Sequence, residues 1–483
     1  MPLEIEAHIH HAVYFMQIAA TADELYEKGG DDLRRGIQLF DSAWTNIAAA
    51  QAWACANLHN EGAARLCNEY PDYASSMLNL RLSTDERIRW RKLGLKAARR
   101  VKDRRAEVNH LYNLANAYSE AQDVPRARYY FERARIGFDQ LKDRWGTARV
   151  RGGLATCYQQ SGKLTLALRN YQRAIKLARY CHDNGFKAML FNNQGVTYLE
   201  LGRPREAIKS HKKALALARK TRDRVLEASA LGNLGNVFSQ TGRVRQAIRY
   251  LVQDLEIRRE LHDHRSEGAI LCDLGTCRYR LGQAKEAVAL LEQARLVLRE
   301  ANDEHNEGNA LSMLGNAHFA LKEYDKSTFY FKEKLKLARQ TEDWESEGTA
   351  LAGLGAIHLR LDQPNEALKF LRRALPLARK MENVYGEEVI LGNIGVAYAD
   401  LGKPALALKH YERQLSIAKE INDPGGTATA LYNIAITEAQ RGQKMKAIRY
   451  AAQALSILVE IEDSGIEQVR NKLAEWRADS HSQ

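Results

Sequence analysis

The stretch ALGNLGNVFSQTGR, which runs from Ala230 to Arg243, sets three glycines among asparagines and raises the question of a phosphate-binding loop. Such a loop follows a β-strand and carries the motif GxxxxGK[ST], whose backbone N–H groups and lysine hold the phosphates. The chain contains no such motif, and no strand pattern precedes Ala230. We therefore interpret Gly235 as a packing position, tolerated inside a helix at a cost of about 1 kcal/mol because a side chain would push the neighbouring helix away.

Other residue types that catalyse reactions or bind metals form no recognisable site. The histidines of HIHH could touch a metal, but on one helix only His8 and His11 share a face well. Six scattered cysteines without a CxxC pair are typical of a reducing compartment rather than of a disulfide framework. These are Cys55, Cys67, Cys157, Cys181, Cys272 and Cys277. We expect no catalytic residue, no metal and no cofactor.

Composition favours a largely helical protein of the cytoplasm. There are only 8 prolines among 483 residues, no apolar run reaches eighteen residues, and the N-terminus lacks the pattern of a secretory signal. The net charge is +12, and residues Arg81–Arg105 hold 11 Lys and Arg against 3 acidic residues. This basic segment could attract nucleic acid or an acidic partner. The alternative is a solvated helix face whose long side chains cover apolar surface.

Three series of residues recur every forty positions in one register. The glycine series is Gly162, Gly202, Gly242, Gly282, Gly402 and Gly442. The acidic series is Asp103, Asp143, Asp183, Asp223, Asp263, Asp303, Asp343, Asn383, Asp423 and Asp463. The alanine series is Ala127, Ala167, Ala207, Ala247, Ala287, Ser327, Ala367, Ala407 and Ala447. Residues 104–463 therefore form nine units of forty residues without insertion or deletion.

Each unit reads as two antiparallel helices. The first helix has apolar residues at helical spacing and ends near the glycine, where a left-handed C-cap belongs. Pro204, Pro364 and Pro404 fit the first turn of the second helix, and the acidic residue marks the turn to the next unit. Because no unit can bury its apolar face alone, we expect the units to stack into a right-handed superhelix.

This pattern resembles the tetratricopeptide repeat (TPR) over all nine units, about three-quarters of the chain. One unit carries the pattern as Phe191, Gly195, Tyr198, Ala207 and Ala214, and another as Leu391, Gly395, Tyr398, Ala407 and Tyr411. Each unit is six residues longer than the usual thirty-four, which implies longer helices. The resemblance implies an all-α right-handed TPR superhelix, an α-solenoid, with an N-terminal helical cap.

In the TPR family the first helices line a concave groove, and asparagines there hold the backbone of a peptide. An asparagine amide offers both donors and an acceptor, whereas it is an indifferent helix former, so its recurrence needs a reason. The alternative is an asparagine ladder that bonds helix to helix inside the array. The predicted peptide-binding residues are Asn113, Asn116, Arg149, Asn193, Asn233, Asn236, Asp273, Arg280, Asn316, Asn393 and Asn433.

The predicted groove varies along the chain. No lysine stands beside the asparagines, which disfavours the carboxylate clamp of chaperone adaptors, and only Arg149 and Arg280 bring positive charge close. From Gly353 onward the groove positions become small and apolar. We therefore expect the C-terminal half to prefer an apolar anchor on its ligand.

The first hundred residues are helical but lack the repeat. They resemble the segment that links the ATPase core of NB-ARC-type STAND signalling proteins to their repeat sensors. The matching residues are Tyr14, Phe15, Ala19, Ala22, Leu25, Tyr26, Phe40, Trp44, Asn46, Ile47, Ala50 and Trp53. The resemblance implies that this chain is a sensor half, whose partner is an NTPase domain or protein. The alternative, compatible with the first, is a cap that shields the first repeat.

We therefore divide the chain into an N-terminal helical region (1–80), a basic helix (81–103), the nine units (104–463) and a C-terminal capping helix with a tail (464–483). The predicted function is binding of a protein or peptide, not catalysis. A small-molecule sensor is the first alternative, which polar groove residues concentrated in one pocket would favour. A nucleic-acid binder using residues 81–105 ranks last, because the predicted groove has few aromatic residues for stacking. We expect no contact with membranes.

Overall fold

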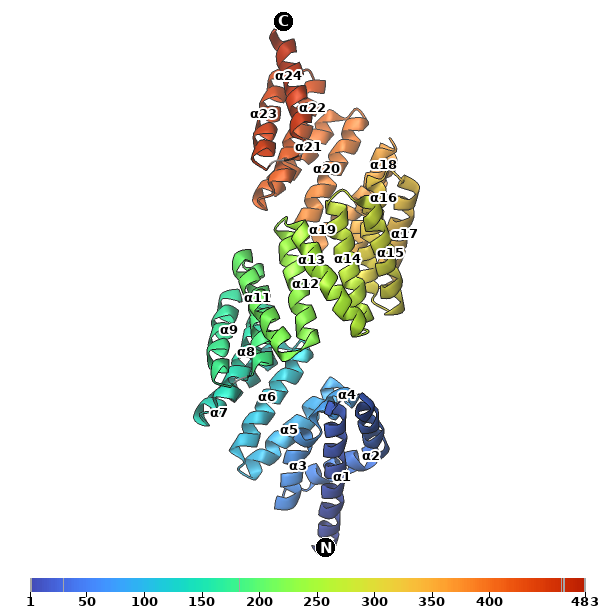
Figure 1. Ribbon diagram of the computed structural model, residues 1–483. Helices are drawn as coiled ribbons and strands as arrows, with labels where there is room; N and C mark the ends of the chain where they lie inside the picture. Colours follow the sequence, from blue (N-terminus) through green and yellow to red (C-terminus); the bar gives the residue numbers. More distant parts are fainter. Residues whose placement is uncertain (1, 29, 182, 462, 464, 482–483) are drawn as a thin grey trace. The chain divides into compact units, whose positions relative to one another are not determined.

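The repeated pattern of the sequence becomes a repeated pattern of helices (Figure 1). The structure, a computed structural model, describes residues 2–28, 30–181, 183–461, 463 and 465–481. Over these residues the chain forms 24 α-helices, one short 3-10 helix at Arg179–Cys181 and no strand. This confirms the predicted all-α fold.

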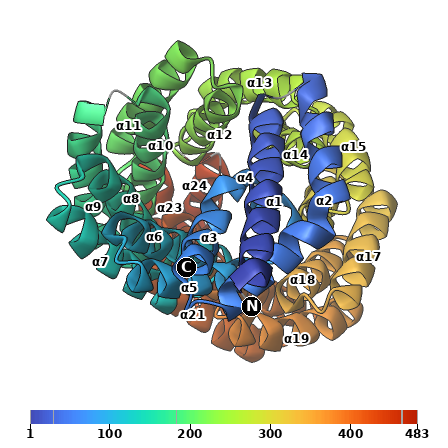
Figure 2. The same ribbon diagram turned by 90° about the horizontal axis from the view of Figure 1, so that it is seen from below.

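Five helices precede the repeats, and the first two lie antiparallel side by side (Figure 2). They are α1 (Pro2–Lys28), α2 (Gly30–Ala56), α3 (Glu61–Tyr73), α4 (Ser75–Arg81) and α5 (Thr84–Arg100). Ser83 and Glu86 form a capping box that starts α5, because each side chain accepts the other's backbone N–H. The basic segment of the sequence is therefore mainly one helix, α5, and the residues that follow it.

Nine helix pairs follow within the described residues, one for each predicted unit. The first helices are α6 (Arg104–Glu120), α8 (Arg144–Gln160), α10 (Asn184–Glu200), α12 (Arg224–Gln240), α14 (His264–Arg280), α16 (Glu304–Ala320), α18 (Trp344–Arg360), α20 (Val384–Asp400) and α22 (Pro424–Gln440). The second helices are α7 (Val124–Gln140), α9 (Leu164–Ala178), α11 (Pro204–Thr221), α13 (Val244–Glu260), α15 (Ala284–Glu300), α17 (Tyr324–Gln340), α19 (Pro364–Lys380), α21 (Pro404–Glu420) and α23 (Lys444–Glu460).

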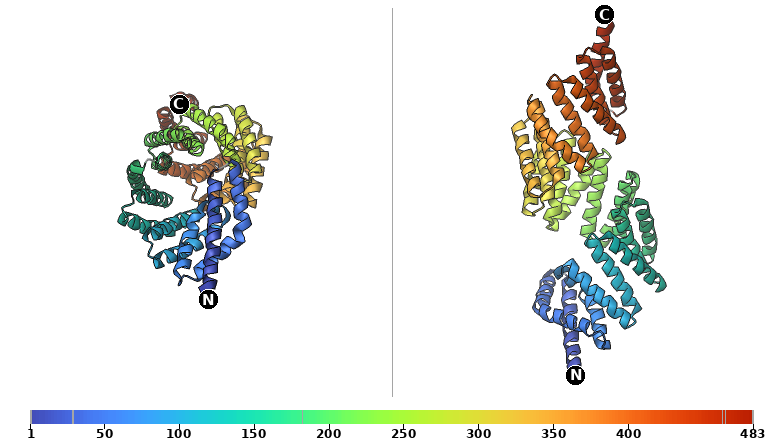
Figure 3. Two further views of the ribbon diagram at one scale, coloured as in Figure 1. Left: turned by 60° about the horizontal axis from the view of Figure 1, so that its bottom comes forward. Right: turned by 180° about the vertical axis from the view of Figure 1, so that it is seen from behind.

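Contacts divide the chain into two larger parts, Met1–Val237 and Phe238–Gln483, which we call the first and the second contact unit to distinguish them from the forty-residue repeat units. Figure 3 shows the antiparallel pairs within each of them. In the second contact unit the last helix, α24 (Ile466–His481), buries Val469, Leu473 and Trp476 beside α22 and α23. This helix covers the last pair, as we expect of a cap. Of the predicted capping segment, residues 464, 482 and 483 lie outside the described residues.

The turns between helices use the two residue series as predicted. The six glycines of the glycine series all have a φ between 67° and 78°, the left-handed conformation that favours glycine. The acidic residues cap the first helices: Asp103 accepts the backbone N–H of Ala106 at 2.9 Å, and Asp343 accepts that of Ser346 at 3.0 Å. Each such cap satisfies an N–H group that has no partner in its helix and contributes about 1 kcal/mol.

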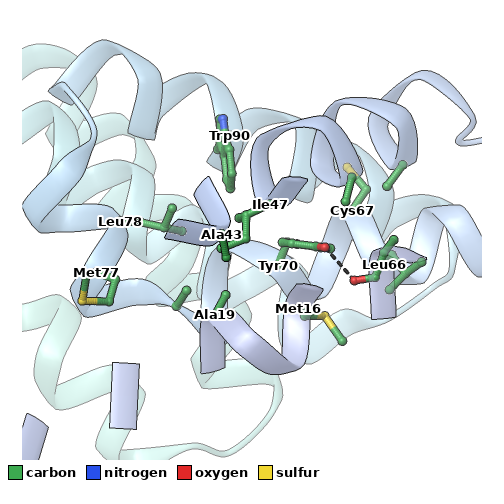
Figure 4. Packing of buried hydrophobic residues seen from close by; sticks show 14 of the residues in the cluster. Met16, Ala19, Ala43, Ile47, Leu66, Cys67, Tyr70, Met77, Leu78 and Trp90 are labelled. Carbon is green, nitrogen blue, oxygen red and sulfur yellow. Dashed lines mark hydrogen bonds between the residues drawn. The ribbon is translucent and has the colours of Figure 1, made fainter. Parts of the chain in front are cut away.

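The N-terminal helices have a core of their own, centred on Tyr70 (Figure 4). The Tyr70 hydroxyl donates to the backbone carbonyl of Ala12 at 2.6 Å, which ties α3 to α1. Trp44 of α2 stacks on Trp90 of α5 with ring centroids 6.0 Å apart. Because α5 also packs along α6, this core leads directly into the first repeat.

Glycines inside the first helices allow the two helices of a pair to approach closely. A Cβ on Gly395 would lie 2.4 Å from the ring of Tyr411, and one on Gly275 would lie 2.6 Å from Leu291. Gly195, Gly315 and Gly355 meet the second helix in the same way. Gly235, in the stretch that suggested a phosphate loop, occupies the same repeat position. The packing interpretation is therefore confirmed at five equivalent glycines.

An ion pair that we did not predict joins most pairs to the next one. An arginine near the end of a second helix, or of α5, meets a largely buried glutamate eight residues later, in the next first helix, at 2.7–3.0 Å. We call this contact the Arg–Glu clasp. Its members are Arg99–Glu107, Arg219–Glu227, Arg259–Glu267, Arg299–Glu307, Arg339–Glu347 and Arg379–Glu387.

His211 occupies a position where other units have a large apolar residue. Its ring is fully buried against Gly195, and its Nδ1 lies 2.9 Å from the Asn192 Oδ1. Burial disfavours the charged ring and lowers the pKa of His211 from 6.5 to about 4. The folded chain therefore holds this histidine neutral under mildly acidic conditions.

The close contact at the glycines predicts that Gly395→Ala destabilises the fold. Overpacking against Tyr411 costs about 1–3 kcal/mol, which exceeds the gain of about 1 kcal/mol from the helix propensity of alanine. We expect a lower urea midpoint by circular dichroism. Gly185→Ala is the control, because its Cβ would meet only the Asp183 carboxylate at 3.5 Å. An equal effect of the two substitutions would contradict the packing role.

The burial of His211 predicts a loss of stability in acid. The folded state binds fewer protons than the unfolded state between pH 6.5 and about 4, so stability is fully present above pH 6.5 and falls as the pH drops through this window. The full difference is about 3 kcal/mol. His211→Phe supplies the residue found at Phe131 and Phe331 and should flatten the pH dependence of the urea midpoint. An unchanged slope in the variant would contradict this reading.

Candidate functional site

The first helices of successive pairs pack against one another. Contacts join α6, α8 and α10 in the first contact unit, and they join α14, α16, α18, α20 and α22 in the second. Among the described pairs, no two second helices pack together to a comparable extent. We call the solvent-facing side of the first helices the first-helix face. The predicted asparagines belong to these helices, which the fold brings closest together.

All eleven predicted site residues reach solvent at least in part. The exposed ones are Asn236, Asp273, Arg280 and Asn316. The half-buried ones are Asn113, Asn116, Arg149, Asn193, Asn233, Asn393 and Asn433. Their exposure is compatible with ligand contact, whereas a fully internal ladder would have buried them.

The asparagines nevertheless differ in their partners. The Asn233 Nδ2 donates to the Asn192 Oδ1 at 3.1 Å, so the internal ladder exists at this one point. Asn193 hydrogen-bonds the hydroxyl of Tyr171. In contrast, the side chains of Asn116, Asn393 and Asn433 make no hydrogen bond within the described part of the chain. These three amides are the ones free to bind a ligand.

Three of the predicted residues line one hollow of about 530 Å³ in the first contact unit. We call it the N-terminal pocket; it lies between α3, α4 and α5 on one side and the first repeats on the other. Its lining residues are Asp72, Ser75, Asn79, Arg87, Arg91, Arg105, Asn109, Asn113, Asn116, Ala117, Glu120, Phe138, Asp143, Trp145, Gly146 and Arg149. The wall is therefore mainly polar and charged.

Ion pairs organise this wall. Arg91 pairs with Asp72, Arg87 pairs with Glu120 at 2.6 Å, and Arg105 pairs with Asp143 at 2.9 Å. Arg149, by contrast, lies over the ring of Tyr112 at 4.3 Å. The repeat pattern predicts Arg149, Asn113 and Asn116 as site residues, but it does not predict the contribution of α3–α5, which have no repeat to place them.

Two other predicted residues, Asn316 and Asn393, line a hollow of about 400 Å³ in the second contact unit. We call it the C-terminal pocket. Its lining residues are Asn316, Phe331, Trp344, Glu345, Gly348, Thr349, Ala352, Gly353, Ala356, Leu377, Ala378, Met381, Asn383, Tyr385, Gly386, Val389, Ile390 and Asn393. The wall is mainly apolar, and it includes Gly353 and Ala356 of the small apolar run in the sequence.

Small residues hollow out the C-terminal pocket, and two aromatic residues stand at its rim. Trp344 is 44% exposed and Tyr385 is 62% exposed. The ammonium group of Lys380 lies 4.4 Å from the Trp344 ring. Neither aromatic was predicted; the available signal was Trp344 in the first turn of its helix, where most other units carry a polar residue.

The remaining candidates for chemistry have structural roles. His318 stacks on Tyr330 and His358 stacks on Phe370, each as the aromatic it replaces would. Cys157 and Cys277 are buried in the array. No group of three or more His, Cys, Asp or Glu among the described residues could hold a metal ion. Among the described helices, none combines the length and the apolar character that a membrane span requires.

The basic segment is largely neutralised by its neighbours. Six of its 11 basic residues form ion pairs with acidic residues, for example Arg81 with Asp41 and Arg99 with Glu107 at 2.9 Å. The others in pairs are Arg87, Arg91, Arg104 and Arg105. The charge that suggested nucleic-acid binding is thus mostly used within the fold.

Comparison with solved structures returns helical repeat proteins. The apo form of the quorum sensor NprR from B. thuringiensis is 13% identical, with a TM-score of 0.53 over 77% of this chain and 98% of that one. The apo form of RapI is 15% identical, with a TM-score of 0.50 over 57% and 98%. At these identities the likeness shows the fold alone.

A Signal Transduction ATPase with Numerous Domains (STAND) protein with a tetratricopeptide repeat sensor, from Pyrococcus horikoshii, is 16% identical. Its TM-score is 0.46 over 84% of this chain and 54% of that one. No curated protein matches the chain in sequence.

The family model described as tetratricopeptide repeat matches most of the chain. Its matches overlap along the array and cover residues 104–180, 146–220, 186–260, 226–300, 306–380 and 387–458. Together with the nine helix pairs they confirm the predicted α-solenoid fold. The chain belongs to the tetratricopeptide repeat family.

Proposed function

We propose that the chain is a binding module that holds an extended or helical segment of another protein, or a free peptide, on the first-helix face. One observation carries the proposal: the C-terminal pocket combines an apolar hollow with the free amide of Asn393. Asn433 occupies the same repeat position in the next unit, and its amide is also free. An apolar hollow beside free asparagine amides suits a peptide, because a peptide offers apolar side chains for the hollow and backbone N–H and C=O groups for the amides.

The size of each contact shows why a repeat array suits this task. Burying one large apolar side chain in the C-terminal pocket contributes about 1.5–3 kcal/mol. Each backbone hydrogen bond to an asparagine adds about 1 kcal/mol. Micromolar affinity needs about 8 kcal/mol, after the cost of ordering the ligand is met. A ligand must therefore contact several units, which the first-helix face provides.

A narrower role as the sensing half of a STAND-type system rests on α1 and α2. Phe40, Ile47 and Ala22, which carry that resemblance, are fully buried between these helices and their neighbours. In this role an NTPase domain or protein in the cytoplasm would receive the signal. NprR, named a quorum sensor, has the same fold, so the fold is suited to sensing.

The N-terminal pocket favours a second candidate function, the sensing of a small polar molecule. Polar residues concentrated in one pocket are the feature that favours such a sensor. Twelve of its lining residues are polar or charged, and its volume of about 530 Å³ lies in the range of small-molecule sites. Nucleic-acid binding remains the weakest candidate, because ion pairs occupy most of the basic segment.

The asparagine hypothesis predicts that Asn393→Ala combined with Asn433→Ala weakens peptide binding. Peptides are selected from a displayed random library on the full chain, and their Kd is measured by fluorescence anisotropy. Loss of two hydrogen bonds should raise Kd about tenfold or more. Asn233→Ala is the comparison, because its amide is bound to Asn192. Equal affinity of the double variant and the wild type would contradict the hypothesis.

The apolar pocket predicts that Val389→Asp abolishes binding of selected peptides that carry a large apolar residue. A carboxylate at the pocket wall would lose its bound water when the apolar residue of the peptide enters the pocket, and this loss opposes binding. Val384→Asp is the matched control, because Val384 also lies on α20 and is 40% exposed, close to the 38% of Val389. Of the two valines, only Val389 lines the pocket. If both variants bind like the wild type, the anchor lies elsewhere.

A further inference from the structure

Arg149 is the one arginine of the N-terminal pocket that has no acidic partner among the described residues. It comes from α8, at the level where α6 supplies Asn109, Asn113 and Asn116. The other three arginines of the wall each pair with a carboxylate. The pocket therefore has one guanidinium more than it has carboxylates.

Aromatic rings hold this guanidinium in place. It lies 4.3 Å from the ring centre of Tyr112 and 5.9 Å from that of Trp145. Its Nε is buried and makes no hydrogen bond. Stacking fixes the plane of an arginine and leaves its edge for hydrogen bonds. The two terminal nitrogens of Arg149 are not among the buried atoms and make no hydrogen bond within the described part of the chain, so a ligand in the pocket can supply their acceptors.

Free amides surround the same space. The side chains of Asn109 and Asn116 make no hydrogen bond within the described part of the chain, and the Asn113 Nδ2 reaches Asp72 only at 3.5 Å. These groups can donate to an anion or bind an adjoining amide. Positive charge, oriented donors and a hollow of about 530 Å³ thus occur together.

We propose that the N-terminal pocket binds a carboxylate, with Arg149 as its anchor; the site differs from the lysine-containing clamp of chaperone adaptors because its free cation is an arginine stacked on Tyr112. A single uncompensated guanidinium matches one negative charge, and its planar fork fits a carboxylate with two parallel hydrogen bonds. A phosphate monoester carries about −1.5 to −2 at pH 7 and would need a second free cation, which Arg87, Arg91 and Arg105 do not offer because each already pairs with an acid.

The carboxylate has two possible sources, the end or an acidic side chain of a peptide, or a small free acid. The inference does not depend on the peptide site of the second contact unit, because the C-terminal pocket shares no residue with the N-terminal one. If the Asn393 and Val389 variants bind peptide like the wild type, the proposed carboxylate site is not affected. If the Arg149 variants bind carboxylate like the wild type, the proposed peptide site is not affected.

Saturation-transfer NMR on the full chain tests the proposal at constant ionic strength. The probes are butyrate, the peptide Ac-Ala-Ala-Ala-Ala with a free C-terminal carboxylate, the same peptide as an amide, and Ac-Ala-Glu-Ala-NH2. We expect binding of at least one carboxylate probe and none of the amide. The strongest probe identifies the source: small acid, peptide end or acidic side chain. Inorganic phosphate, added as a competitor, should displace the bound probe less well than butyrate does.

Arg149→Gln should raise the Kd of the bound probe about tenfold or more. Arg149→Lys keeps the charge but lacks the fork, so we expect a smaller loss. Arg169→Gln, on an exposed arginine of α9, is the matched control and should bind like the wild type. Circular dichroism checks that each variant folds; if Arg149→Gln does not, Arg149→Lys decides.

Results of three kinds would overturn the proposal. The first is the absence of binding by every carboxylate probe at millimolar concentration. The second is equal binding of the amide, or equal affinity of the Arg149 variants and the wild type. The third is displacement by phosphate at lower concentration than by butyrate, which would mean that the pocket offers more than one free cation.

Discussion

The fold depends on one constraint: a helix pair of forty residues cannot bury its apolar face alone and must pack on the next pair. The contact that satisfies this constraint is close. Glycines such as Gly153 and Gly353 leave no room for a Cβ, and Phe131 and Phe331 of the preceding pair fill the space. The Arg–Glu clasp then ties the end of one pair to the start of the next. Since successive first helices pack together, their solvent-facing sides form a continuous face within each contact unit.

That face carries two pockets of different chemistry. The N-terminal pocket is charged, with a stacked arginine that lacks an acid. The C-terminal pocket is apolar, with small residues in its wall and aromatic residues at its rim. The C-terminal pocket arises where the repeat is varied: the helix positions stay the same, while side chains at solvent-facing positions change. The N-terminal pocket arises where the helices α3–α5 meet the first repeats. A binding module can acquire new ligands in this way without loss of the packing that holds it together.

Features that recur every forty residues were predictable from the sequence, and features that occur once were not. The helix bounds, the left-handed glycines and the acidic caps follow from three series, and His318 and His358 could be placed because they replace an aromatic. The Arg–Glu clasp also recurs, yet arginine and glutamate are too common at exposed helix positions for the series to stand out. The N-terminal pocket needs α3–α5, whose places no repeat defines. Likewise, Asn233 is bound to Asn192, whereas the equivalent residue 41 positions before the free Asn393 is Ala352; this difference acquires its meaning only once the fold shows that the two positions touch.

Binding on the first-helix face is the central claim, and amide hydrogen exchange tests it most directly. The full chain is compared with and without a peptide selected from the displayed library. We expect slower exchange in α18 and α20, the first helices that supply most of the C-terminal pocket. Slower exchange confined to the second helices α15, α21 and α23, which supply no residue of the pocket, would place the ligand on the opposite side of the pairs and would contradict the claim.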